Sequence, residues 1–99
     1  MVKRKIVIEH SAKLSLKKAY EFIRKDSNQN AEKVKDKILQ SIKLLEINPE
    51  RHAPDKFCID NGGCFRAYEI FRYRITYHIS ISTITVIRIR HSKMNPIIY

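Results

Sequence analysis

The spacing of the apolar residues changes partway along the chain, and this change limits the folds that the chain can adopt. Over residues 12–45 the apolar side chains recur every three or four positions, which places them on one face of a helix. Over residues 73–81 they recur every second position, as in a strand with one buried face. The sequence therefore predicts an α+β fold in which helices in the first half pack on strands from the second.

The first half predicts one strand and two helices. Residues 5–9 are short and β-branched and predict a strand, after which Ser11 is a plausible N-cap for a helix over 11–25. A second helix is predicted over 29–47, and it must end near Pro49 because proline lacks the backbone donor that a helix needs. Two amphipathic helices joined by a short polar link form an antiparallel hairpin. The apolar faces of these helices must be buried against another surface.

The second half predicts that surface. Residues 49–63 contain two prolines and two glycines and predict an irregular connection, with a short strand near 57–59. Three strands over 64–70, 73–81 and 85–90 then form an antiparallel meander. The resulting fold has an N-terminal strand and a helical hairpin packed on a mainly antiparallel sheet. The residues expected on its apolar face are Tyr73, Ile75, Tyr77, Ile79 and Ile81, with Ile87 and Ile89 of the last strand.

Length, charge and apolar runs narrow the class of protein. The 99 residues fit a single domain over 1–99, and 43% hydrophobic residues can fill its core. No apolar run approaches the ~20 residues of a membrane helix, so we expect a cytoplasmic protein without a membrane partner. The 20 Lys and Arg exceed the 10 Asp and Glu by ten charges, which predicts a negatively charged partner. Nucleic acid, an acidic protein and a merely basic surface all remain open.

Cysteine and histidine spacing gives no indication of a metal site. Cys58 and Cys64 flank a predicted turn, and the four histidines are scattered, whereas zinc needs four ligands at close spacing. We therefore expect no metal and no cofactor. The two sulfurs could pair if the strands beside the turn come close, although a reducing cytosol favours two free thiols.

Basic residues collect on the second face of the predicted sheet. Strand parity places Arg74 on this open face, where Arg88 and Arg90 can share it and Arg66 with Tyr68 can join them. Arginines bind phosphate, and RNA cleavage needs an acid, a base and cations. If the protein is a nuclease, we expect nearby cations to lower the pKa of Tyr99. The candidate catalytic residues are Arg74, His91 and Tyr99, and the candidate nucleic-acid-binding residues are Arg66, Arg88, Arg90 and Lys93.

Four segments carry a resemblance to a known family. They are Leu45-Glu46-Ile47-Asn48-Pro49, Phe65-Arg66-Ala67-Tyr68-Glu69, Tyr73-Arg74-Ile75-Thr76-Tyr77 and Ile87-Arg88-Ile89-Arg90-His91-Ser92-Lys93. With the predicted order of elements, they resemble the RelE/ParE toxins of bacterial type II toxin–antitoxin modules, also known as plasmid stabilisation proteins. The resemblance covers nearly the whole chain, and it implies the RelE-like fold and an acidic antitoxin as partner.

The family implies two alternative activities. RelE-like members are mRNA interferases, endoribonucleases that cleave mRNA in the ribosomal A site with a basic cluster and a C-terminal Tyr, whereas ParE-like members inhibit DNA gyrase and lack most of that cluster. Arg74 matches the Arg of the family's Tyr-Arg-x-x-Tyr strand, Arg66 and Lys93 fall near other basic positions, and Tyr99 can be aligned with the C-terminal Tyr.

Two departures from the RelE-like pattern bear on the nuclease site. Tyr68 and Glu69 stand where such sites tend to place a Lys, and Asn95-Pro96 replaces a basic pair. The sequence nevertheless favours ribosome-dependent mRNA cleavage, with gyrase inhibition as the alternative. A non-catalytic nucleic-acid-binding module is a third possibility, which surface aromatics on the sheet would favour.

Overall fold

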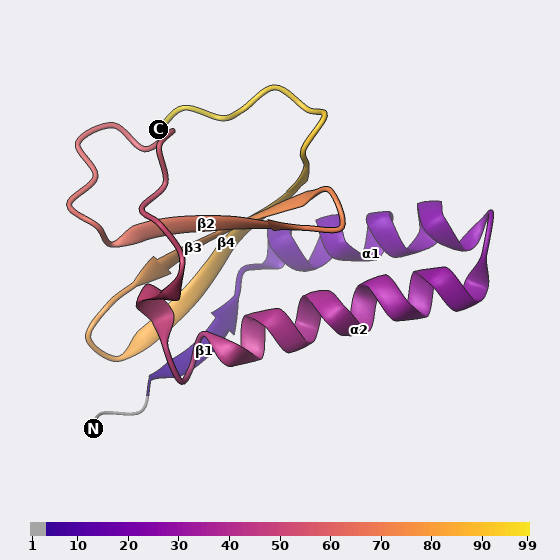
Figure 1. The fold of residues 1–99 in the computed structure, drawn as a ribbon, viewed down its shortest axis with the longest axis horizontal. Helices are drawn as coiled ribbons and strands as arrows, with labels where there is room; N and C mark the ends of the chain where they lie inside the picture. Colours follow the sequence, from indigo (N-terminus) through magenta and orange to yellow (C-terminus); the bar gives the residue numbers. More distant parts are fainter. Residues whose placement is uncertain (1–3) are drawn as a thin grey trace.

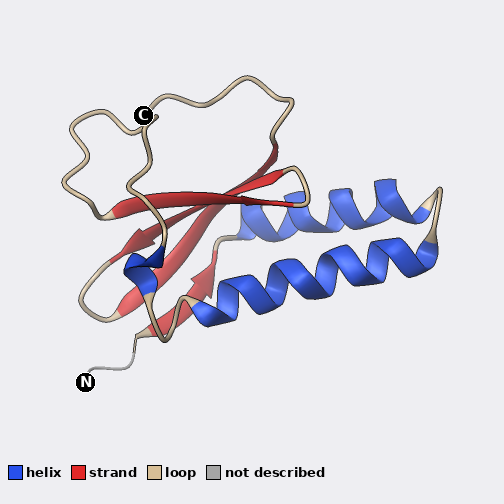
Figure 2. Cartoon of the chain, viewed as in Figure 1, coloured by secondary structure: helices blue, strands red, loops and turns tan. Residues whose placement is uncertain are grey.

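The computed structural model describes residues 4–99. In chain order the elements are β1 (Lys5–Ile8), α1 (His10–Arg24), α2 (Asn28–Leu44), the 3₁₀ helix η1 (Pro49–Arg51), β2 (Phe65–Ile70), β3 (Tyr73–Ile79) and β4 (Thr83–His91) (Figure 1). The sheet has the order β1-β4-β3-β2, in which β1 runs parallel to β4 and the other neighbours are antiparallel. Both long helices lie on the same side of the sheet (Figure 2). The predicted α+β fold is confirmed.

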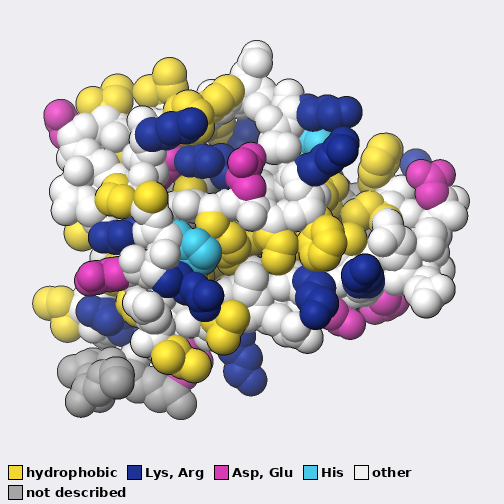
Figure 3. Space-filling view, in the orientation of Figure 1, with side chains coloured by type: hydrophobic (Ala, Val, Ile, Leu, Met, Phe, Trp, Pro, Cys, Tyr) yellow, Lys and Arg dark blue, Asp and Glu magenta, His cyan; other side chains and the backbone are white. Residues whose placement is uncertain are grey.

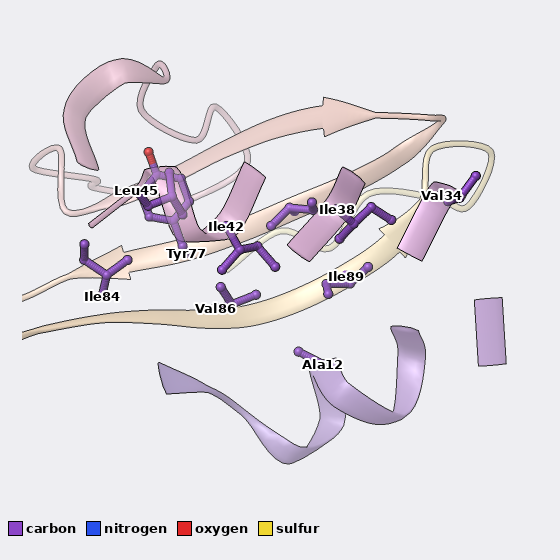
Figure 4. Packing of buried hydrophobic residues seen from close by; sticks show 10 residues of the cluster. Ala12, Val34, Ile38, Ile42, Leu45, Tyr77, Ile84, Val86 and Ile89 are labelled. Atoms are coloured by element: carbon purple, nitrogen blue, oxygen red, sulfur yellow. The ribbon is translucent and has the colours of Figure 1, made fainter. Parts of the chain in front are cut away.

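The core lies between the hairpin and the sheet. Val34, Ile38 and Ile42 recur along one face of α2 and are buried, as their spacing predicts. They form one buried cluster with Ile75 and Tyr77 of β3. Figure 4 shows Tyr77 on the sheet together with the three residues of α2. The rest of the buried cluster is Ala12, Leu45, Ile84, Val86 and Ile89. The alternating pattern of β3 therefore supplies the surface that the apolar stripe of the hairpin requires.

The ends of the helices differ from the prediction. Helix α1 begins at His10 behind Glu9, so Ser11 lies inside the helix and its predicted capping role is wrong. Helix α2 is capped by Ser27, whose side chain accepts a hydrogen bond from the Asn30 amide. It ends at Leu44, three residues before the predicted end at 47, because the Leu45 amide donates to Ile42 and Lys43 in a tightened last turn.

Segment 57–59 forms turns, so the short strand predicted there is wrong. The connecting loop instead meets the edge of β2 earlier, where Pro54 bridges Arg66 and the Asp55 amide donates to the Phe65 carbonyl at 2.8 Å. Strand β3 ends at Ile79, which leaves Ile81 in the turn to β4 with 87% of its surface exposed. The predicted place of Ile81 on the apolar face is therefore also wrong.

A β-bulge in β4 adjusts which of its residues face the helices. Tyr77 pairs with Val86, whereas the preceding Thr76 pairs with Arg88, so Ile87 is an extra residue. Val86 and Ile89 are both buried, three positions apart, while Ile87 is only half-buried. The simple alternation predicted for Ile87 and Ile89 is wrong because the bulge reverses the parity between them.

Tyr77 provides a test of how the core is tied to the chain beyond α2. Its ring is fully buried, and its hydroxyl donates a 2.5 Å hydrogen bond to the Pro49 carbonyl. We expect Tyr77→Phe to lower the free energy of unfolding by about 1–3 kcal/mol, because it leaves that carbonyl without its donor. Urea unfolding measures the change, with Tyr20→Phe as control: this variant removes a phenol hydrogen bond to Glu32 outside the core and is expected to cost much less. Equal losses in the two variants would contradict this account.

Candidate functional site

A cavity of about 150 Å³ lies between the open face of the sheet and the chain that follows β4. Residues 92–99 fold back from the end of β4 toward the loop before β2 (Figure 1). There the Tyr99 amide donates to the Phe57 carbonyl at 3.1 Å, and the Ile59 amide donates to the Tyr99 carbonyl. The residues lining the cavity include Asp55, Phe57, Glu69, Arg74, Thr76, Arg88, Arg90 and His91, with Ser92, Met94 and Asn95 of the returning chain.

Asp55 is the centre of the hydrogen bonds at this cavity. Its side chain is almost fully buried, and Oδ1 lies 2.7 Å from Nη2 of Arg74 and accepts the Phe57 amide at 3.1 Å. Oδ2 accepts the Tyr99 hydroxyl at 2.6 Å. Burial raises the pKa of Asp55, but the hydrogen bonds from Tyr99, Arg74 and Phe57 outweigh it and hold the pKa below its ordinary value. Asp55 is therefore a buried carboxylate that joins the loop, β3 and residue 99.

The phenol of Tyr99 keeps its proton. Burial and the hydrogen bond to Asp55 raise its pKa, although the Arg88 guanidinium, 4.6 Å from the ring centre, opposes them. The prediction that neighbouring cations lower this pKa is wrong, because burial and the hydrogen bond to Asp55 outweigh the charge of Arg88. In this arrangement Tyr99 acts as a hydrogen-bond donor to Asp55 and is poorly suited to act as a base.

The structure brings three of the predicted arginines to the cavity. Arg90 pairs with Arg74 and Arg88 with Thr76 across the strands, which places all three arginines on the open face as predicted. Arg74 also stacks over the Phe57 ring at 4.9 Å, and Arg90 donates to the Asn95 carbonyl at 3.2 Å. Each arginine thus makes a contact within the chain that fixes its position.

Arg66 and Tyr68 lie on the opposite face, so the prediction that they join the cluster is wrong. Arg66 pairs with Tyr77, and Tyr68 pairs with Ile75. Tyr77 and Ile75 are buried and face the helices. The two-residue connection between β2 and β3 pairs Ile70 with Tyr73 and so fixes this register. Arg66 donates to the carbonyls of Gly63 at 3.0 Å and His52 at 2.7 Å. Whether it binds nucleic acid stays a prediction.

His91 and Lys93 lie at the end of β4. His91 pairs with Tyr73, on the parity of the apolar face, and their rings meet edge to face at 5.1 Å. Nδ1 of His91 accepts the Lys93 amide at 3.1 Å, and Lys93 is exposed. His91 reaches the edge of the cavity, but its parity differs from that of Arg74. Its catalytic role and the nucleic-acid contact of Lys93 stay predictions.

The sequence analysis missed two acidic residues of the site. Glu69 pairs with Arg74 and lines the cavity, and the register of the β2–β3 hairpin could have placed it there. Asp55 lies in an irregular loop, where no period relates a residue to a face. Only its position after Pro54 and the need of a half-buried arginine for an anion point to it.

Three further properties of residues 4–99 concern metal ions, thiols and membranes. This part of the chain holds no group of three or more His, Cys, Asp or Glu side chains arranged to bind a metal ion. Cys58 and Cys64 are both free thiols. Within the described range no helix has the length and apolar character that crossing a membrane requires.

Comparison with known proteins identifies the class and then the family. The fold is similar to that of a solved structure described as a chromosomal ParDE TA system from P. aeruginosa, which matches with a TM-score of 0.74 at 14% identity, over 92% of this chain and 98% of that one. The sequence matches the family of the ParE toxin of the type II toxin–antitoxin system parDE over residues 6–96. The chain therefore belongs to the ParE toxin family, and this membership implies an antitoxin as its partner. A search of curated proteins gave no match.

Asp55→Asn tests the buried carboxylate. The substitution leaves Arg74 without its anion, and we expect the free energy of unfolding near neutral pH to fall by about 3–5 kcal/mol. Because the folded pKa of Asp55 lies below the unfolded value of ~3.9, its stabilisation is complete above that value and is lost as the pH falls through the folded pKa.

The difference in unfolding free energy between wild type and Asp55→Asn should therefore be constant above pH ~5 and shrink in more acidic buffer. Urea unfolding at a series of pH values measures it. Asp26→Asn, which removes an exposed carboxylate, is the charge-matched control and should change little. A difference that grows on acidification would contradict the proposed ion pair.

Proposed function

We propose that this toxin inhibits DNA gyrase, the ParE-like alternative, rather than cleaving mRNA as the sequence alone favours. The match to the ParE family supports this proposal. The observation that carries it at the site is the Asp55 carboxylate, which already binds Arg74 and Tyr99. These are two of the three residues that a nuclease mechanism would use.

The chemistry of the site also supports the proposal. Cleavage by a 2′-hydroxyl needs a group that accepts its proton and cations that stabilise the charge developing on the phosphate. The raised pKa of Tyr99 keeps its phenol protonated and makes it a poor base. The guanidinium of Arg74 is already paired with Asp55 and is therefore less available to stabilise charge on a phosphate. A protein that acts by binding gyrase needs neither group for chemistry. In such a protein the contacts of Asp55 with Arg74 and Tyr99 serve to hold residues 92–99 in place.

The Tyr99→Phe variant distinguishes the two activities. It removes only the hydroxyl and keeps the ring that packs against Arg88 and Phe65. We expect wild type and Tyr99→Phe to block supercoiling by gyrase within about threefold of each other, since a gyrase inhibitor has no chemical use for the phenol. Primer extension on translated mRNA should show intact message for both proteins.

The nuclease alternative gives the opposite result. A-site cuts by the wild-type protein that fall about 10²-fold in Tyr99→Phe and in Arg74→Ala, with gyrase unaffected, would overturn the proposal. Circular dichroism of each variant checks that the fold is kept. Expression without antitoxin should arrest bacterial growth in either case, so growth arrest alone does not distinguish the two activities.

We further infer that an acidic segment of the antitoxin covers a groove on the helical hairpin. The groove has a volume of about 340 Å³, and its lining includes both apolar side chains and lysines. Its lining residues are Ile8, Lys13, Leu16, Lys17, Tyr20, Lys35 and Leu39. Lys and Arg side chains also dominate the charged groups on the face shown in Figure 3. An amphipathic segment with acidic edges would bury its apolar side here and pair with the lysines.

The rate of complex formation tests this inference. We expect the association rate constant of toxin and antitoxin to fall steeply with added salt, because opposite charges steer the encounter. Replacing Lys13 and Lys17 by Glu should lower the rate about tenfold at low salt. Lys18→Glu with Lys25→Glu makes the same charge change outside the groove lining and is the matched control. A rate that does not respond to salt, or equal effects of the two pairs, would count against the groove.

A further inference from the structure

The turn between β2 and β3 holds two residues in an unfavourable backbone conformation. Ile70 pairs with Tyr73, so the connection consists of Phe71 and Arg72 alone. Their φ angles are +51° and +67°, in the left-handed region that two-residue hairpins of type I′ require at both positions. Asn-Gly satisfies this turn with little strain, whereas a bulky side chain such as Phe at positive φ is a real outlier. The chain thus places a Phe and an Arg where other residues would stabilise the hairpin better.

Both residues of the strained turn are presented to solvent. Phe71 is 43% exposed, although it is one of only nine aromatic residues available to the core, and Arg72 is exposed as well. Strained conformations concentrate at positions where a side chain is needed for function, so this outlier points to a function for the exposed pair. Packing does not explain the pair, because Tyr73 and Tyr68 beside it already supply the aromatic contacts to the core.

A second exposed segment adjoins the turn. The Ser92 amide donates to the Arg72 carbonyl at 2.7 Å, which fixes the start of the returning chain against the tip of the hairpin (Figure 1). This segment adds Lys93, which is exposed, and Met94, which is 56% exposed. We call Phe71, Arg72, Lys93 and Met94 the tip surface. The tip surface contains two cations and two large apolar side chains, and residues 70–73 and 91–95 contain no acidic residue.

This composition is that of a small binding hot spot for protein. Aromatic side chains, Met and Arg are enriched at the centres of protein interfaces, where one anchor in a pocket provides much of the affinity. Arg72 and Lys93 require carboxylates on the partner, by charge complementarity. We propose that Phe71 inserts into an apolar pocket with an acidic rim on the protein that the toxin inhibits. The identity of that protein as gyrase rests on the proposed function, but the contact itself does not.

A variant that relieves the strain tests the proposal. Phe71→Asn with Arg72→Gly supplies the residues that the turn prefers, so we expect the thermal midpoint to stay at or above that of the wild type. The concentration that half-inhibits gyrase supercoiling should nevertheless rise about 30-fold or more, the scale of a lost anchor residue. Ile81→Asn, in the other β-hairpin turn and even more exposed, is the control and should inhibit as wild type does. Unchanged inhibition by the double variant would overturn the proposal.

Further measurements distinguish this contact from the proposed gyrase inhibition, from antitoxin binding and from DNA binding. If the wild-type protein does not inhibit gyrase, the proposed function fails, and growth arrest is then used to measure the contact. Loss of growth arrest in the double variant, with an unchanged Kd for the antitoxin, supports the proposal for the tip surface. An antitoxin Kd that rises by the same factor as the loss of inhibition assigns the surface to the antitoxin and overturns the proposal. So does a matching loss of affinity for a short DNA duplex, which would make Phe71 a wedge between bases.

Discussion

The buried carboxylate of Asp55 is the interaction on which the candidate site depends. In a chain with a formal charge of +10, its two oxygens accept hydrogen bonds from a loop amide, from Arg74 of β3 and from Tyr99. These three donors come from parts of the chain that share no regular pairing with one another. Without an anion at this point, Arg74 would be half-buried and without its ion pair. Residue 99 would then be held by its backbone bonds to residues 57–59 and by the contacts of its ring with Arg88 and Phe65. The cavity exists because Asp55 holds both of its walls.

The bulge in β4 reconciles this charged face with the apolar core behind it. If the pairing of Tyr77 with Val86 continued regularly, Ile75 would face Arg88, and the arginines of β4 would point among the helices. Burying them there without partners would cost several kcal/mol each. The single extra residue, Ile87, moves Arg88 opposite Thr76 and returns Ile89 to the core. One inserted residue therefore satisfies both faces of the same strand.

The features that could be predicted from the sequence are those that follow from the spacing of apolar residues. The helical stripe of α2 and the alternation in β3 fix which side chains are buried, and strand parity placed Arg74, Arg88 and Arg90 correctly. Periodicity has no control over register, which a two-residue turn sets, so Arg66 was assigned to the wrong face. It also has no control over irregular chain. Asp55 could not be placed, and the pKa of Tyr99 was predicted in the wrong direction because periodicity reveals neither the burial of the phenol nor its hydrogen bond to that carboxylate.

The charges of the molecule divide into those that are used within the chain and those that face outward, and this division bears on function. A phosphate at Arg74 would approach the Asp55 carboxylate, 2.7 Å from that guanidinium, and would have to overcome both the repulsion and the existing ion pair. Lys13 and Lys17 beside an apolar groove, and Arg72 and Lys93 beside exposed Phe71, face no such competition from Asp55. An incoming acidic protein surface meets these cations more readily than it meets Arg74. The arrangement suits a toxin that acts by binding proteins, with its open-face arginines serving to hold the returning chain.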